Sequence, residues 1–271
     1  MGEDFNNSNK DSLAFVVDLS DRRGEYLYSS LENLGYKVFA IDKNYRHELA
    51  EKVKYIYVLA PRVWLELENI DNIMPDSIVF CLGMSDITRE RLAFKGCRAI
   101  NYFDDELLAI NNAILTAYGT KNILENADIQ IENAKVLVLG GGRVGRSVSK
   151  VLAGYNASVV VATKDPIEAV IVDEWCDKVI NFKDFDIEIA SYNVIINTVP
   201  ALVLKNKELK KCNKGCFILD LASMPGGVDF IAAKNLGLQV EHALGIPGRF
   251  LPIEAAQLML NSILKRVEFD G

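Results

Sequence analysis

Three glycines at a fixed spacing are the strongest sign of chemistry in this sequence. Gly140, Gly142 and Gly145 fit the pattern G-x-G-x-x-G and stand between an apolar run and a stretch with helical spacing. The first glycine permits a tight turn, the second lets the backbone approach a pyrophosphate, and the third lets helix and strand pack closely. Glycine turns also serve purely structural ends. A second apolar run, Ser158–Ala162, follows at the spacing of a βαβ unit, so the context favours a dinucleotide site.

The end of that second run bears on the choice of cofactor. An Asp or Glu there would bind the ribose hydroxyls of NAD and repel the 2′-phosphate of NADP. The sequence instead has Thr163 and Lys164, a hydroxyl and a cation, which favours NADP and leaves NAD as the alternative. A solvated turn also explains these residues, and Asp165 stands next to them. A lysine is a less specific phosphate ligand than an arginine.

Two further loops follow apolar runs, Asn197–Pro200 and Asp220–Gly227. Ligands of an open α/β sheet lie outside the carboxyl ends of its strands, so we expect both loops at the same crevice as the glycine turn. Turns that merely end strands are the alternative. The predicted cofactor residues are Gly140, Gly141, Gly142, Arg143, Val144, Gly145, Thr163, Lys164, Thr198, Val199, Pro200 and Ala222.

Eleven short apolar runs, rich in β-branched residues, predict the strands that position these loops. Their nearly continuous hydrophobicity is typical of parallel strands that are buried on both faces. The predicted strands are Leu13–Val17, Lys37–Ile41, Tyr55–Leu59, Ile78–Leu82, Ala99–Tyr102, Val136–Leu139, Ser158–Ala162, Lys178–Phe182, Val194–Asn197, Phe217–Leu221 and Gln239–His242. Open twisted sheets seldom exceed about ten strands, so we expect two α/β domains, with five and six strands.

The chain is expected to divide where helical spacing interrupts the strands. Leu108, Ala109, Ala113 and Ala117 recur at intervals typical of a helix, within a linking region at 104–133. The predicted parts are a disordered polar tail at 1–12, an N-terminal substrate domain at 13–103, the linking region, a nucleotide-binding domain at 134–250 and a C-terminal helix region at 251–271. That last helix is expected to pack on a sheet or across the domain boundary.

Composition narrows the class of protein. With 271 residues, 50% of them hydrophobic and 25% charged, the chain reads as an ordinary globular protein. Its apolar runs fall short of the roughly 20 residues of a membrane span. A net charge of −7 without a basic block argues against nucleic acid as a partner. The five cysteines lack the spacing of a metal site or a disulfide framework, so they are assigned to packing and no metal is expected.

One long block carries a resemblance to a known family. Asp-Leu-Ala-Ser-Met-Pro-Gly-Gly at 220–227, with Gly-Ile-Pro-Gly at 245–248, resembles the A subunit of dipicolinate synthase. The similarity continues more thinly through Ile196–Pro200, the glycine turn and Ala109–Thr120, and faintly into 21–23, so it covers most of the chain.

The resemblance implies an N-terminal flavodoxin-like domain beside a Rossmann domain. It implies oxidation of a cyclic dihydrodipicolinate-type intermediate to pyridine-2,6-dicarboxylate, with a pyridine nucleotide, during bacterial sporulation. The implied location is the cytoplasm of the mother cell, and the implied partner is a flavoprotein-like B subunit. Whether the chain also forms homo-oligomers is left open.

The same hypothesis gives roles to five polar residues. Ser223, with Asn112 or Thr116, is expected to contact the substrate across a cleft as the catalytic group. Arg23 and Arg143 are the predicted clamps for the substrate carboxylates, because a guanidinium pairs bidentately with a carboxylate. A surface salt bridge is the alternative for Arg23. Together with Lys164, these arginines should create a local positive charge on an acidic protein.

Departures from the family pattern keep two other functions open. Leu115 and Tyr118 stand where the family has Pro and Glu, and Ile253-Glu254 replaces a Lys-Thr pair. Thr163 replaces an arginine of the family. These changes fit a non-catalytic nucleotide-binding protein or sensor. A different two-domain dehydrogenase, such as one acting on a 2-hydroxy acid, would need a His–acid pair near the nicotinamide, and His242 is the available candidate.

Overall fold

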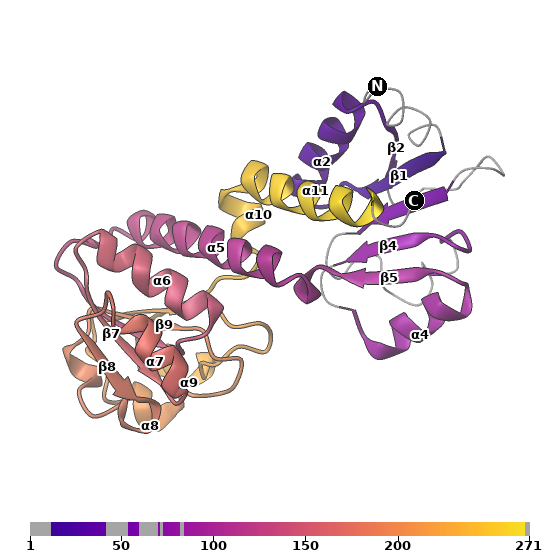
Figure 1. The fold of residues 1–271 in the computed structure, drawn as a ribbon. Helices are drawn as coiled ribbons and strands as arrows, with labels where there is room; N and C mark the ends of the chain where they lie inside the picture. Colours follow the sequence, from indigo (N-terminus) through magenta and orange to yellow (C-terminus); the bar gives the residue numbers. More distant parts are fainter. Residues whose placement is uncertain (1–11, 42–53, 60–69, 71–72, 82–83, 269–271) are drawn as a thin grey trace. The chain divides into compact units, whose positions relative to one another are not determined.

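The chain folds into two compact units, which we describe from a computed structural model covering residues 12–41, 54–59, 70, 73–81 and 84–268 (Figure 1). Unit 1 comprises residues 1–112 and 251–271, and unit 2 comprises residues 113–250. The division falls inside one long helix, α5 (Glu106–Asn126). The predicted N-terminal tail lies almost entirely outside the described residues.

Unit 1 is built on a five-stranded parallel sheet. Its strands have the order β2-β1-β3-β4-β5, which is the order of flavodoxin-like folds. The elements are β1 (Leu13–Asp18), α2 (Arg22–Asn33), β2 (Lys37–Ile41), β3 (Lys54–Val58), β4 (Ile78–Cys81), α4 (Asp86–Phe94), β5 (Arg98–Asn101), the 3-10 turn η1 (Tyr102–Asp104) and α11 (Pro252–Glu268).

Helices cover both faces of this sheet. On one face, Leu27 of α2 and Met259 and Ile263 of α11 pack with strand residues such as Phe15 and Phe80. Leu92 of α4 belongs to the core on the other face. In Figure 1, α2 and α11 lie side by side, in agreement with their many contacts. The C-terminal helix therefore packs on the N-terminal sheet, although about 230 residues of chain separate it from β1.

Unit 2 is built on a six-stranded parallel sheet with the order β8-β7-β6-β9-β10-β11. This is the order 3-2-1-4-5-6 of Rossmann folds, counted from β6. The elements are β6 (Lys135–Leu139), α6 (Arg143–Gly154), β7 (Ser158–Thr163), α7 (Pro166–Val172), β8 (Lys178–Asn181), η2 (Phe182–Asp184), η3 (Ile189–Ser191), β9 (Val194–Asn197), α8 (Asn206–Leu209), β10 (Phe217–Asp220), α9 (Phe230–Asn235), β11 (Gln239–His242) and α10 (Ile246–Phe250).

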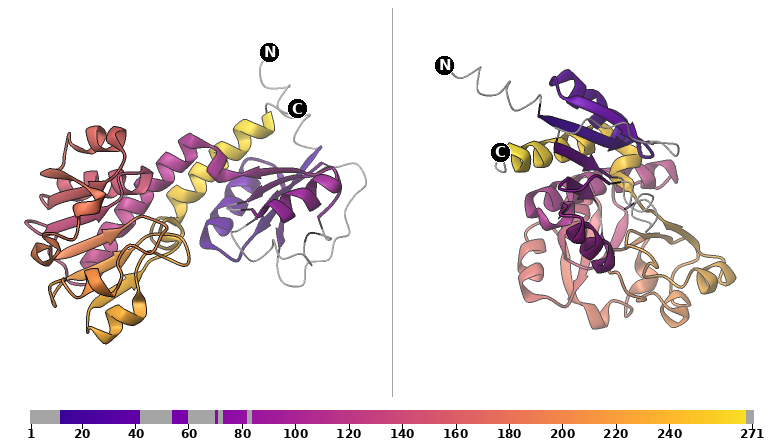
Figure 2. Two further views of the ribbon diagram at one scale, coloured as in Figure 1. Left: turned by 90° about the horizontal axis from the view of Figure 1, so that it is seen from below. Right: turned by 90° about the vertical axis from the view of Figure 1, so that its right-hand side faces the viewer.

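Two apolar cores flank the sheet of unit 2. One contains Val148 and Leu152 of α6 together with Ala117 of α5, and the other contains Leu209 of α8 and Ala233 of α9. Helices thus lie on both faces of the sheet, as Figure 2 shows from two further directions. Burial on both faces explains why the strands read as nearly continuous apolar runs.

The predicted strands and their grouping are confirmed. All eleven are present, with ends within one residue of the predicted ends, and they form sheets of five and six strands. The predicted fold class, two doubly wound parallel α/β domains, is therefore correct. Among the described residues, no helix is long and apolar enough to cross a membrane.

Candidate functional site

The glycine turn joins β6 to α6 and has the geometry that the sequence pattern predicts. Gly140 has φ +98°, and a β-carbon there would lie 2.6 Å from Oγ1 of Thr198. A β-carbon at Gly145 would lie 2.0 Å from the carbonyl oxygen of Gly140, so helix and turn touch through backbone atoms. At Gly142 the nearest atom would be a carboxylate oxygen of Glu168 at 3.5 Å, an ordinary van der Waals contact.

Neighbouring strands hold this turn from both sides. The backbone N–H of Gly140 donates to the carbonyl of Ala162 at 2.9 Å. Thr198 donates twice to the carbonyl of Leu139, from its N–H at 3.0 Å and its hydroxyl at 2.8 Å. Gly142 is the N-cap of α6, and no side chain caps that helix end. The first turn of α6 is therefore accessible to an anion, which helix N-termini favour.

A pocket of about 530 Å³ opens beside the turn. This volume lies in the usual range for small-molecule sites. Ten of the twelve predicted cofactor residues line it: Gly140, Gly141, Gly142, Arg143, Val144, Thr163, Lys164, Thr198, Val199 and Pro200. The other two predicted cofactor residues, Gly145 and Ala222, do not line the pocket. Four residues that the sequence pattern did not single out complete it: Glu168, Phe182, Ala201 and Val203.

Glu168 corrects one premise of the cofactor prediction. We found no acid at the end of the second strand, yet the hydroxyl of Thr163 in β7 donates to Oε2 of Glu168 at 2.5 Å. Asp165 caps α7 and accepts from the N–H groups of Ile167 and Glu168. Side chains in a first helical turn lean towards the N-terminus, so Glu168 reaches back to the strand. The spacing D-x-x-E was the available signal, since it marks a helix start.

The predicted loop Asp220–Gly227 is held by the side chain of its first residue, Asp220. This carboxylate is fully buried and accepts from Nδ2 of Asn197 at 2.8 Å and from the N–H groups of Ala222 at 3.1 Å and Gly227 at 2.7 Å. The last residue of β10 thereby fixes both ends of the loop that follows it. Asp220 thus has a supporting role in the loop that the sequence pattern did not predict.

His242 is satisfied within the protein. Its Nε2 lies 2.8 Å from the carbonyl oxygen of Ala222, and its ring stacks on Phe230 with 5.3 Å between the ring centroids. The half-buried ring thus has a backbone carbonyl and an aromatic ring as its partners, and not the carboxylate of a His–acid pair. The other histidine, His47, lies outside the described residues.

The predicted catalytic residues lie in different parts of the fold. Ser223 is exposed on the loop after β10, where its carbonyl accepts from the N–H of Gly226 at 2.9 Å. The adjacent Met224–Pro225 peptide bond is cis. Asn112 and Thr116 lie one turn apart on α5, with Asn112 in unit 1 and Thr116, like Ser223, in unit 2. Their contact with a substrate stays a prediction.

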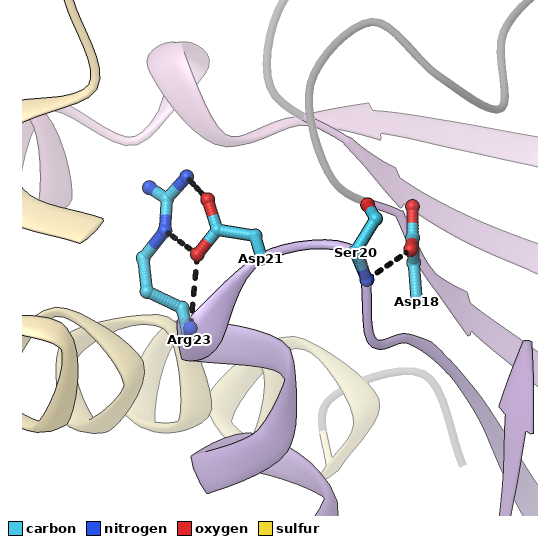
Figure 3. A network of polar contacts seen from close by, with 4 residues as sticks. All are labelled: Asp18, Ser20, Asp21 and Arg23. Carbon is cyan, nitrogen blue, oxygen red and sulfur yellow. Dashed lines mark hydrogen bonds and ion pairs between the residues drawn. The ribbon is translucent and has the colours of Figure 1, made fainter. Parts of the chain in front are cut away.

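Arg23 is already engaged by a neighbour. Figure 3 shows its guanidinium facing the carboxylate of Asp21 at the start of α2, with Nε 2.9 Å from Oδ1 and Nη2 2.5 Å from Oδ2. Its side chain is only 9% exposed. It lines two pockets of about 10 Å³ each, room for a water molecule rather than a dicarboxylate. This geometry favours the salt-bridge alternative, with a buried guanidinium and a half-buried carboxylate.

The ion pair changes the acidity of Asp21. Burial opposes ionisation, but the hydrogen bonds and the charge of Arg23 outweigh it and hold the pKa of Asp21 below its ordinary value. In the same network, Oδ1 of Asp18 accepts from the N–H of Ser20 at 2.8 Å (Figure 3). The turn after β1 is thus fixed by two carboxylates and one guanidinium.

The cysteines have the packing role that the sequence predicts. All five thiols are free, and four of them are buried. Burial raises the pKa of Cys81 and Cys216 to about 12 and that of Cys176 and Cys212 to about 11, and it also raises the pKa of Cys97. Thiols with such pKa values are poor nucleophiles. Within the described residues, no three His, Cys, Asp or Glu side chains are grouped as metal ligands.

Comparison with known proteins shows which families this chain is similar to. Residues 111–234 match the family model of the alanine dehydrogenase/PNT C-terminal domain. The chain is 29% identical over 205 residues to the A subunit of dipicolinate synthase of Bacillus subtilis, which covers 75% of this chain and 69% of that protein. It is 25% identical over 228 residues to a shikimate dehydrogenase (NADP(+)) of Clostridium perfringens, covering 77% and 75% of the two chains.

A solved structure shares the whole fold. The crystal structure of the dipicolinate synthase A subunit from Bacillus halodurans matches with a TM-score of 0.81 and 23% identity, over 94% of this chain and 97% of that one. The resemblance read from the sequence is therefore confirmed, and the fold is that of the dipicolinate synthase A subunit.

Proposed function

We propose that this chain, a relative of the A subunit of dipicolinate synthase, oxidises a dihydrodipicolinate-type intermediate to pyridine-2,6-dicarboxylate in a sporulating bacterium. The observation that carries the proposal is the joint presence of a dinucleotide pocket and the buried network that shapes the Asp220–Gly227 loop, the block on which the resemblance rests. The substrate loses one hydride and one proton as its ring becomes aromatic.

The pocket fits a dinucleotide by its backbone. Gly140 and Gly145 leave no room for side chains, while Gly142 is the N-cap of α6 and lines the pocket. These residues would hold the pyrophosphate, and Thr198, Val199 and Pro200 would bound the nicotinamide half. A bound nicotinamide dinucleotide supplies the hydride acceptor. A carboxylate, that of Glu168, lines the same pocket.

Substrate recognition is assigned to polar groups near the loop ends. Arg143 is exposed and lines the pocket, so it is our first candidate for pairing with a substrate carboxylate. Ser223, with Asn112 or Thr116, would orient the ring, and Arg23 would contribute only if its pair with Asp21 opened. Aromatisation is strongly downhill, so positioning is the main demand on the protein.

The partner and the location follow from the relationship alone. We propose that the chain works with a flavoprotein-like B subunit on a small dicarboxylate substrate, in the cytoplasm of the mother cell. Copurification of the two coexpressed proteins tests the partnership, and this chain expressed without its partner is the control.

The decisive experiment measures product formation. Purified protein is incubated with enzymatically generated precursor and with NAD and NADP in separate reactions, with and without the B subunit, and the absorbance of dipicolinate is followed. We expect product with at least one nucleotide. A variant, Gly154→Ala, should also form the product, because a β-carbon at this exposed glycine would meet no atom within 4 Å.

Failure has two distinguishable forms. Nucleotide binding without dipicolinate under any condition would contradict the synthase function and support a non-catalytic protein or sensor, in line with Leu115, Tyr118 and Glu254. Turnover of shikimate or a 2-hydroxy acid, but not of the dihydrodipicolinate precursor, would place the chain among other dehydrogenases.

A further inference from the structure

One carboxylate stands where a dinucleotide site distinguishes its two cofactors. Glu168 lines the pocket of the glycine turn from the first turn of α7. A β-carbon on Gly141 would lie 3.0 Å from its Oε2, and one on Gly142 would lie 3.5 Å from its Oε1. Its carboxylate therefore lies between the glycine turn and the carboxyl end of β7.

The position is held by the strand itself. Thr163 is 5% exposed, ends β7 and donates its hydroxyl to Oε2 at 2.5 Å. This bond uses one carboxylate oxygen and orients the other. A strand-end acid in Rossmann folds accepts hydrogen bonds from the ribose hydroxyls of NAD and repels the 2′-phosphate of NADP. Glu168 reaches the same place from the following helix, five residues beyond Thr163.

Arg143 and Lys164 are the two cations in the lining of this pocket, and Lys164 is the one next to Thr163. It is exposed, and an ammonium on a flexible stem is well hydrated and screened by salt. Glu168 is half-buried and tied to a buried hydroxyl, so its charge is fixed and less screened. The fixed carboxylate therefore outweighs the mobile ammonium at the position of the 2′-substituent.

We infer that Glu168 selects NAD(H) over NADP(H) in this protein. The inference rests on the proposed use of a nicotinamide dinucleotide. It replaces the expectation drawn from Thr163 and Lys164, because Thr163 serves to orient the acid rather than to bind a phosphate.

Equilibrium binding tests the inference without any substrate. Dissociation constants of NADH and NADPH are measured by fluorescence for the full chain and for Glu168→Gln, which keeps the size of the side chain and an oxygen acceptor for Thr163. We expect the unaltered protein to bind NADH about tenfold more tightly or better, and the ratio to fall about tenfold in the variant. Glu174→Gln removes the same charge at an exposed site outside the pocket and should leave the ratio unchanged.

A pair of fragments isolates the 2′-phosphate. Adenosine 2′,5′-bisphosphate differs from 5′-AMP by that group alone, so their competition against NADH should show the same preference. Tighter NADPH than NADH binding by the unaltered chain would overturn the inference whether or not the variant folds. A ratio that Glu168→Gln leaves unchanged would also overturn it. Binding of neither nucleotide would refute the inference together with the proposed function, whereas a missing dipicolinate product would refute only the function.

Discussion

At the scale of single residues, buried carboxylates hold the loops that end the strands. Asp220 is fully buried, and three N–H donors satisfy its carboxylate. Hydrogen bonds to an ionised acceptor are stronger than neutral ones. The Asp220 side chain therefore helps to hold the shape of the Asp220–Gly227 loop.

Asp220→Asn should disturb this network with little change of volume. The amide places an NH₂ group where an oxygen now accepts, so it faces either the N–H of Gly227 or the donors of Asn197 and Ala222. We expect unit 2 to lose about 2 kcal/mol of unfolding free energy, measured by urea denaturation. Glu174→Gln, at an exposed position, should leave the midpoint of the urea unfolding transition unchanged. An unchanged midpoint in Asp220→Asn would show that the loop is held by something else.

At the scale of elements, contact between α6 and the preceding turn defines the proposed nucleotide site. The helix can start where it does only because Gly145 carries no side chain and lets the carbonyl of Gly140 approach. The helix also packs Val148 and Leu152 into the core, so its position is fixed from both sides. A shift of α6 would therefore move the phosphate site.

Two glycines of α6 provide a matched pair of variants. Gly145→Ala places a methyl group 2.0 Å from a backbone oxygen, and we expect a loss of about 3 kcal/mol in stability and at least a tenfold weaker affinity for the dinucleotide. Gly154→Ala, at the exposed end of the same helix, should instead gain about 0.5 kcal/mol through helix propensity. Thermal unfolding and nucleotide titration measure both. Equal behaviour of the two variants would contradict this account of the turn.

At the scale of the whole molecule, each unit has its own sheet and its own pair of cores. The nucleotide pocket belongs entirely to unit 2, whereas the ion pair of Asp21 and Arg23 belongs to unit 1. Asp105 of unit 1 accepts from the hydroxyl of Ser262 in α11 at 2.8 Å. Burial works against ionisation of Asp105, but its hydrogen bonds and the charge of Arg266 lower its pKa. The N- and C-terminal segments of unit 1 are therefore joined by charges that acid removes.

Unit 1 should accordingly lose stability in acid. The folded pKa of Asp21 lies below its ordinary value of 3.8, so its contribution is complete above that pH and is lost as the pH falls through the lowered value. Asp21→Asn can still cap α2 but carries no charge. We expect it to cost about 1 kcal/mol at neutral pH and to reduce the acid dependence, as measured by urea denaturation at several pH values. An unaltered pH dependence would exclude Asp21 as a source of acid sensitivity.

Residues that are close together along the chain were enough to predict the strands and the glycine turn. Apolar runs specify the strands, because parallel strands buried on both faces leave few polar positions, and the eleven predicted strands are present. The G-x-G-x-x-G spacing specifies its turn, because the steric limits act between Gly140 and Gly145, only five residues apart. Five of the ten predicted cofactor residues that line the pocket, 140–144, belong to this turn, and the other five end or follow the neighbouring strands β7 and β9.

Only the tertiary structure decided which side chains meet across the ends of the elements. Glu168 reaches the strand end because α7 turns its first residues back onto β7, and Asn197 meets Asp220 because β9 and β10 are neighbours in the sheet. The C-terminal helix joins the N-terminal sheet through apolar contacts that no local pattern specifies. The charges and the hydrophobic faces were visible in the sequence, but their partners depend on the packing of elements that are distant along the chain.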